Sequence, residues 1–436
     1  MLKNFFNKDT TKILHGMPIA VFYKFFAVAC SYALYFFLAR MLGSEEFGLF
    51  SLASAIIVSA AFLGRFGLDY VLLRHSAICT AGAQTGLLRA WFFRASLLSG
   101  SMALLLTLLM IGAGQWLCDS VFSKEELFAP LLAMALGLVP QTLLFLQAET
   151  LKGSGHIRAS QLLQGDGGGF FVFAAAFCFS LPLAAVYGVT GAALGFSLAS
   201  WAGFCAGERT LHRLFAHAQR EMPPSYSLLL RLGLPLFFAS ALSLVVTKAG
   251  IFFLGLWSST AAVGIFVLAQ KLSLLGANIQ TACCTVMGPR ITVLHSTGNT
   301  EDLADYYRQG TRLSFGIGAA VLCGMVVLAS PLLGLLGTDF LQGETAFRIL
   351  IAGELCSLAL GPTSTALIAS GFTREHCTAV GMAALTMLAA GLVFVPPWGL
   401  AGAAVAAGAG TLAQAVAQAL FIKRRLGFFP FLFRIV

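Results

Sequence analysis

The chain has 436 residues, of which 58% are hydrophobic and only 10% are charged, and its mean hydropathy is +0.87. Soluble domains carry about 25% charged residues, so this composition excludes an ordinary soluble protein and indicates an all-α polytopic membrane protein. The net charge of +9 does not indicate a nucleic-acid partner, because the basic residues fall in short clusters between apolar runs, where they set membrane topology.

Apolar runs of about 20 residues, the length that crosses roughly 30 Å of hydrocarbon, follow one another along the whole chain. The first run lacks a recognisable cleavage site, so it is expected to be a retained helix and not a signal peptide. Turns around Pro182 and Pro396-Pro397 are expected to separate two closely spaced helix pairs. About twelve membrane-spanning helices are predicted, at residues 14–38, 47–71, 93–113, 128–149, 167–184, 186–206, 230–254, 263–286, 313–336, 346–369, 377–395 and 399–421.

The distribution of the 27 lysines and arginines predicts the orientation of these helices. Most of them fall on one side of the predicted membrane, together with both termini, whereas only Arg40, Lys124 and Arg348 fall on the other side. Because basic loops stay in the cytoplasm, both termini are predicted to be cytoplasmic.

The sequence also repeats itself. Gly48–Ala53 resembles Gly264–Ala269, and Gly188–Ala193 resembles Gly399–Ala404. Two further matches keep the same order, at a spacing of roughly 210 to 217 residues, so the chain is predicted to contain two six-helix lobes of the same orientation. The expected boundaries are 1–207 for the N-terminal lobe, 208–227 for a basic cytoplasmic linker and 228–436 for the C-terminal lobe.

Neither the cysteines nor the glycines indicate a cofactor. The ten cysteines show no CxxC or histidine-spaced set, so no metal site is predicted. The Gly167-Gly168-Gly169 run lacks the lysine of a phosphate-binding Walker motif, and no such motif occurs elsewhere in the sequence. The chain is therefore expected to have no ATPase of its own, and no catalytic residues are assigned.

Four cations lie inside predicted spans, and they are the candidate substrate-binding residues: Lys24, Arg65, Lys248 and Lys271. A charged side chain at mid-bilayer costs roughly 2.5–3.5 kcal/mol on insertion scales, so these positions are functional candidates. Cations that face a water-filled cavity would suit an anionic group such as a diphosphate. Arg65 could instead form a structural ion pair, and Lys248 and Lys271 could extend their amino groups to the outer interface.

Three further polar residues lie near these cations. Asp69 follows Arg65 at the i,i+4 spacing of a helical ion pair. Asn278 lies seven residues after Lys271, and so on nearly the same face of a continuous helix. Glu354 leads a polar stripe in helix 10, where it could carry a proton or only form hydrogen bonds within the bundle.

Several short motifs resemble those of the bacterial polysaccharide-unit flippases, members of the multidrug/oligosaccharidyl-lipid/polysaccharide exporter superfamily. They are the Leu-Gly-x-x-x-Phe-Gly-Leu-Phe core of residues 42–50, Phe66–Asp69 with the later Arg74, Leu232–Pro235, and Gly399–Ala404. The resemblance covers essentially the whole chain. It implies two six-helix lobes that form a V around a central cavity lined largely by helices 1, 2, 7 and 8.

The resemblance also implies a function, namely alternating-access transport of an undecaprenyl-diphosphate-linked oligosaccharide to the outer leaflet of the bacterial inner membrane. The product would serve O-antigen, capsule or exopolysaccharide biosynthesis. The implied partners are this lipid-linked glycan, the bilayer, and polysaccharide polymerase and chain-length machinery. Many relatives carry an acid in the middle of helix 7, where this chain has Lys248, so cation coupling through that helix is not expected.

In the mechanism expected from the cations, Lys24, Arg65 and Lys271 pair with the diphosphate, and rocking of the lobes exchanges the openings. The membrane potential favours outward movement of an anion, by roughly 2.3 kcal/mol per charge per 100 mV, and a H⁺ or Na⁺ gradient could contribute. The alternatives are a lipid II-type peptidoglycan precursor flippase, a cation-coupled multidrug exporter and, from another class, a membrane polysaccharide polymerase or ligase.

Overall fold

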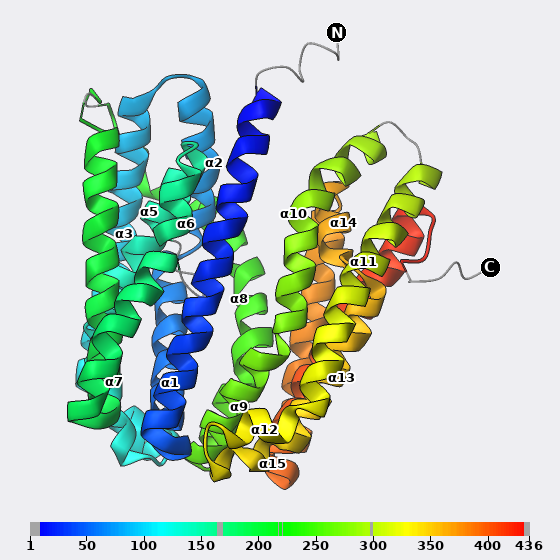
Figure 1. Cartoon of the computed structure of the whole chain (residues 1–436). Coiled ribbons are helices and arrows are strands. Elements are labelled where there is room, and N and C mark those ends of the chain that lie inside the picture. The colour runs from blue at the N-terminus through cyan, green and yellow to red at the C-terminus, as the bar shows by residue number, and fades with distance from the viewer. Residues whose placement is uncertain (1–8, 164–168, 217, 220, 297–299, 431–436) are drawn as a thin grey trace. The chain divides into compact units, whose positions relative to one another are not determined.

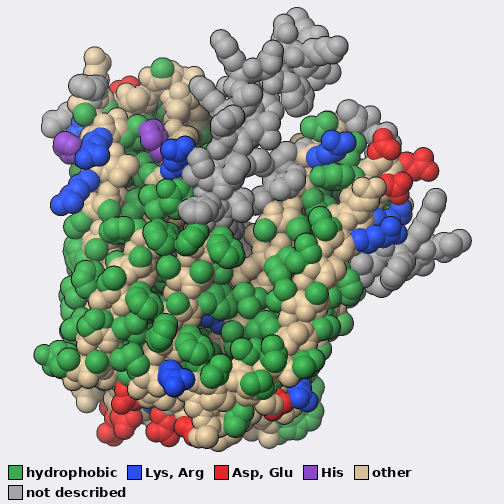
Figure 2. Space-filling view, in the orientation of Figure 1, with side chains coloured by type: hydrophobic (Ala, Val, Ile, Leu, Met, Phe, Trp, Pro, Cys, Tyr) green, Lys and Arg blue, Asp and Glu red, His purple; other side chains and the backbone are tan. Residues whose placement is uncertain are grey.

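The computed structural model describes residues 9–163, 169–216, 218–219, 221–296 and 300–430, and these residues are almost all helical (Figure 1). No β-strand occurs within these ranges, so the predicted all-α fold is confirmed. Hydrophobic side chains cover the middle of the visible helices, and charged side chains gather at the helix ends (Figure 2). This distribution is the one that a lipid bilayer requires, because a charged side chain is costly in the hydrocarbon core.

The chain forms two compact units. The first comprises Met1–Leu42 and Leu52–Ser240, and the second comprises Gly43–Ser51 and Ala241–Val436. The division thus falls at residues other than the expected lobe boundaries of 207 and 228, which remain a prediction from the sequence. Helical structure also occupies part of the expected linker at 208–227.

The first unit contains most of α1, all of α2 to α7, and the beginning of α8. One apolar cluster joins its helices, in which Leu72 packs with Leu151 and Leu211. The helices of this unit are α1 (Asp9–Arg65), α2 (Leu68–Ala81), α3 (Thr85–Trp116), a π-helical turn (Leu117–Val121), a 3₁₀ turn (Glu125–Leu127), α4 (Phe128–Ala135), α5 (Leu138–Gly153), α6 (Ile157–Leu163), α7 (Phe170–Leu214) and the start of α8 (Tyr226–Trp257).

The second unit contains the rest of α8 and all later helices. Its largest fully buried side chains include Phe50, Phe266, Phe340 and Phe347. Two smaller apolar clusters lie toward the C-terminal end of α15. The helices are α9 (Thr260–Ser273), α10 (Leu275–Ser296), α11 (Thr300–Val327), α12 (Ala329–Gly334), the 3₁₀ helix η4 (Thr338–Gly343), α13 (Glu344–Leu360), α14 (Thr363–Ala369) and α15 (Thr373–Leu426).

Three helices are too long for a single membrane crossing. The 57 residues of α1 would extend about 85 Å at 1.5 Å per residue, but Gly43 interrupts the helix with φ 75°. Gly188 in α7 and Gly399 in α15 do the same with φ 58° and 50°. The turn in α15 thus lies at Gly399, directly after the expected turn around Pro396-Pro397. The turn in α7 lies at Gly188, a few residues after Pro182, because glycine reaches positive φ without a steric penalty.

Other predicted spans are interrupted. The predicted span 128–149 bends by 47° between α4 and α5, and 346–369 bends by 40° between α13 and α14. Within the described residues, seven helices are long and apolar enough to cross a membrane, or nine if each bent pair is one span. If each of the three glycine-bent helices is also counted as two spans, the nine become the predicted twelve. The number of spans remains a prediction.

The repeated Gly-x-Phe sequences meet within the second unit. A Cβ atom added at Gly48 would overlap the Thr260 carbonyl oxygen, and one added at Gly264 would overlap the Ser44 carbonyl oxygen. Each glycine thus lets the partner backbone approach, as small residues do in membrane helix pairs. The Ser44 hydroxyl also donates a hydrogen bond to Asp339 Oδ2 at 3.2 Å.

Candidate functional site

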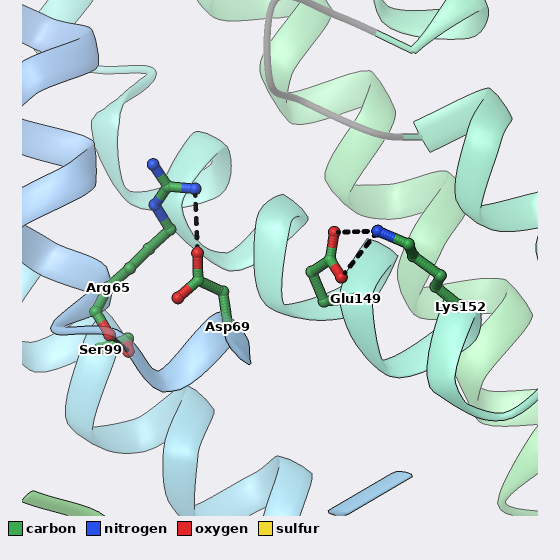
Figure 3. A network of polar contacts seen from close by, with 5 residues as sticks. All are labelled: Arg65, Asp69, Ser99, Glu149 and Lys152. Atoms are coloured by element: carbon green, nitrogen blue, oxygen red, sulfur yellow. Dashed lines mark hydrogen bonds and ion pairs between the residues drawn. The ribbon is translucent and has the colours of Figure 1, made fainter. Parts of the chain in front are cut away.

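The first candidate site is the ion pair of Arg65 and Asp69 in the first unit. Arg65 ends α1, and a tight turn with φ 52° at Phe66 and 73° at Gly67 leads into α2. This geometry places Asp69 in the first turn of α2, where an acid is favourable. Arg65 Nη1 and Asp69 Oδ2 are 3.4 Å apart, so the ion pair that the spacing predicted is present (Figure 3).

The Arg65 side chain is enclosed by its own unit. The residue is 5% exposed, and Asp69 is 7% exposed. The Arg65 guanidinium carbon lies 5.1 Å from the ring centre of Phe62 and 3.7 Å from that of Phe145, which are cation–π distances. The Ser99 hydroxyl donates a 3.4 Å hydrogen bond to the Arg65 carbonyl oxygen (Figure 3). These contacts favour the structural interpretation of Arg65 over cargo binding.

A second ion pair lies on α5. Lys152 Nζ is 3.2 Å from both carboxylate oxygens of Glu149, one helical turn earlier (Figure 3).

The sequence did not indicate Phe145 as a neighbour of Arg65, because 80 residues separate them and nothing in the pattern of α5 marks a phenylalanine as a cation partner. Phe62, three residues before Arg65, could have been found from helical spacing.

The second candidate site is formed by Lys248 and Lys271, both in the second unit. Lys248 lies in the second half of α8, and Lys271 lies in the last turn of α9. Both side chains are half-buried. Two lysines in consecutive helices of one apolar unit would suit an anion with more than one negative charge.

The remaining predicted residues have different outcomes. Asn278 is half-buried in α10, and Lys271 and Asn278 lie in one apolar span, Thr260–Cys284, so their position on nearly the same helical face remains a prediction. Glu354 is half-buried in α13 of the same unit. Lys24 lies in α1, and its side chain is outside the described residues.

Solved structures show which class of protein has this fold. A multidrug resistance MATE family transporter of the MOP superfamily, in an inward-facing conformation, matches with a TM-score of 0.74 and 17% identity over 94% of this chain and 98% of that one. The lipid II flippase MurJ, in an inward closed conformation, matches with a TM-score of 0.74 and 13% identity over 93% and 87%. The fold is thus that of the MOP superfamily transporters.

A third structure, a MOP superfamily transporter from Pyrococcus furiosus Vc1, has a TM-score of 0.57 and 17% identity over 96% of this chain and 94% of that one. At such identities the likeness shows the fold alone. No curated protein sequence matches this chain significantly. Residues 37–342 match the model of the family described as "Polysaccharide biosynthesis protein", and the chain belongs to this family.

Proposed function

We propose that this protein is a flippase that moves an undecaprenyl-diphosphate-linked oligosaccharide from the cytoplasmic to the outer leaflet for polysaccharide biosynthesis. The family match supports a role in polysaccharide biosynthesis, and the fold supports transport. The observation that supports the choice of cargo is the presence of Lys248 and Lys271 in consecutive helices of the second unit.

The two lysines suit the diphosphate of such a lipid. A diphosphate spreads its negative charge over two linked groups, so two lysines could each bind one of them. Lys24 is proposed as a further cation for the same group on the basis of the sequence. The membrane potential would favour outward movement by roughly 2.3 kcal/mol per charge per 100 mV, and Glu354 is a candidate for any proton coupling.

The proposal is tested by replacing each lysine in a strain that lacks the chromosomal copy of the gene. Lys248→Gln and Lys271→Gln should each lower polysaccharide export about tenfold or more, the effect of losing 1.4 kcal/mol of binding. Lipid-linked oligosaccharide should accumulate in the inner leaflet. Lys124→Gln is the matched control, because the Lys124 amino group lies at a turn and donates to the Phe122 carbonyl oxygen.

Two further strains distinguish the alternative cargoes. Rescue of a strain depleted of its lipid II flippase would favour a peptidoglycan precursor, and restored drug efflux in a hypersensitive strain would favour a multidrug exporter. Normal polysaccharide export by the Lys248→Gln, Lys271→Gln and Lys24→Ala variants, at normal protein levels, would overturn the assignment of the cargo site.

A further inference from the structure

The second unit contains a broken helix that has no counterpart at the same place in the first unit. The break lies at Gly361, with φ 76°, and Pro362, between α13 and α14. Proline has no N–H group, so a helix cannot continue its hydrogen-bond ladder through this residue. The carbonyl groups at the end of α13 therefore need other donors.

Tyr307 of α11 supplies one of these donors. Its hydroxyl donates a 2.8 Å hydrogen bond to the carbonyl oxygen of Leu360, the last residue of α13. Tyr307 is fully buried. A buried carbonyl without a donor is unfavourable, so this hydroxyl stabilises the broken conformation.

The start of α14 is held by α15. The buried Gln418 accepts hydrogen bonds at its Oε1 from the Thr363 hydroxyl at 2.7 Å and the Ser364 hydroxyl at 3.0 Å. Its Nε2 lies 3.1 Å from Nδ1 of His376. The seven residues of α14 are too few to form a stable helix alone, so these contacts and apolar packing keep it in place.

The chain after α15 packs onto the same region. Gly427 ends the helix with φ 80°, and the chain then turns back beside α11 (Figure 1). The Phe428 ring centre is 5.5 Å from that of Tyr307, and Phe428 is 8% exposed. Phe429 packs against Leu360 and the neighbouring alanines of α15. These two phenylalanines thus cover both the hydroxyl cap and the end of α13.

The first unit has the same aromatic pair without the break. Phe92 and Phe215 have ring centres 5.9 Å apart, and they precede Tyr307 and Phe428 by about the repeat length. Phe92 has no hydroxyl, and α5 runs unbroken through the corresponding region. The hydroxyl is thus present in the unit where a helix end needs a donor.

We propose that Phe428 and Phe429 form a C-terminal strap that holds the half-helix α14 in place, and that α14 opens locally when the strap detaches. In the first unit, residues of α5 belong to the large cluster of that unit. In the second, α14 and the strap are held by two small separate clusters. Segments with few buried contacts open at a lower free energy than the rest of a domain, so the strap controls the mobility of this end of the unit.

Hydrogen exchange measured by mass spectrometry on the full-length protein in nanodiscs tests the strap. In Phe428→Ala, amides of 363–369 should exchange at least about tenfold faster, whereas amides of 145–153 in α5 should not change. Tyr307→Phe keeps the ring and removes only the hydroxyl, so it should speed exchange in α14 by a smaller factor. Phe215→Ala is the matched control, and it should leave α14 unchanged.

Unchanged exchange in α14 of the Phe428→Ala variant would overturn the strap. An equal acceleration in all helices of the second unit would do the same, because it would reveal a general loss of stability. If Phe428→Ala does not accumulate, Phe428→Leu retains apolar volume without the ring and is judged by the same comparison. None of these outcomes depends on the cargo, so the strap and the proposed function fail separately.

Discussion

The Arg65 guanidinium contacts aromatic rings in addition to the carboxylate of its ion pair. It lies near two phenylalanine rings and is paired with Asp69, all within the first unit. The guanidinium is planar and weakly hydrated, so it stacks on aromatic rings in a way that an ammonium group cannot. The charge in this predicted span is therefore retained by local contacts.

Removing the Asp69 charge should destabilise the protein. Asp69→Asn leaves the Arg65 charge buried without its counterion, and breaking a buried pair in this way costs about 3–5 kcal/mol. Arg65→Lys keeps the charge but loses the stacking, and should cost less. Thermal unfolding of the purified protein in detergent measures both.

The exposed pair of Arg348 and Glu344 provides a control, because surface pairs contribute only about 0–1 kcal/mol. Glu344→Gln should therefore change the melting temperature little. If Asp69→Asn melted like the wild type but failed to transport, the pair would belong to the cargo site and not to the scaffold.

His75 should make the first unit sensitive to acid. Its ring stacks on Trp91 at a centroid distance of 3.8 Å, and burial, followed by the charge of Arg74, lowers the pKa of His75. The folded state favours neutral His75, whereas in the unfolded chain this histidine has the ordinary pKa near 6.5. As the pH falls below that value, the unfolded chain therefore binds more protons than the folded protein. Stability from this residue is present above that pH and is lost as the pH falls.

Melting temperatures at pH 7.5 and 5.5 check this expectation. The wild type should lose stability over this interval, and His75→Gln should lose less, because glutamine does not titrate. Equal pH dependence in the two proteins would show that His75 does not contribute.

At the scale of helices, the repeated sequences were the most informative signal. Gly188 and Gly399 occupy equivalent positions in the repeat, and each interrupts its helix with a similar positive φ. The glycines at 48 and 264 meet each other closely. Repetition therefore predicted which glycines matter, although not what each one does.

The interruptions within helices were harder to predict. The bend at Leu136-Gly137 carries neither a proline nor a charge, and the apolar pattern continues through it. The hydropathy of a segment shows whether it can lie in lipid. The 47° bend between α4 and α5 does not change the hydropathy of the segment, so hydropathy cannot predict the bend. The Gly361-Pro362 break had a recognisable breaker pair within an otherwise apolar run.

Substituting the glycine at the close helix approach should be costly. In Gly48→Ala, the new methyl group would overlap the Thr260 backbone, which cannot move aside as a flexible side chain could. Overpacking of this kind costs about 1–3 kcal/mol. Gly112→Ala in α3 is the control: its methyl group would meet no atom within 4 Å, and alanine favours a helix. A melting temperature of Gly48→Ala at or above that of Gly112→Ala would contradict the close approach.

At the scale of the whole molecule, composition alone was enough to predict the class of fold. A chain with 10% charged residues and repeated 20-residue apolar runs has few ways to fold other than as a bundle of helices in lipid. The cargo could not be predicted in the same way, since transporters of different substrates share this fold. In this chain the neighbours of a buried charge can come from distant parts of the sequence, as Phe145 does for Arg65.

The charge distribution predicts a topology that fusion reporters can test. With basic loops in the cytoplasm, a fluorescent protein fused after residue 436 should fluoresce, and alkaline phosphatase fused after residue 123 should be active. The reverse pattern at both sites would refute the predicted orientation, and with it the direction of transport proposed for the cargo.

The assignment of Gly43–Ser51 to the second unit, and of the first turns of α8 to the first, has a consequence for biosynthesis. The ribosome completes α1 to α7 before Leu229 of α8 exists, although this side chain is part of the apolar cluster of the first unit. That unit must therefore wait for the start of the second repeat before it can close its core. If the two halves of this chain are expressed as separate proteins cut near residue 216, the second half lacks Gly43–Ser51 and the first half lacks the first turns of α8. The two halves should therefore fold only when they are made together.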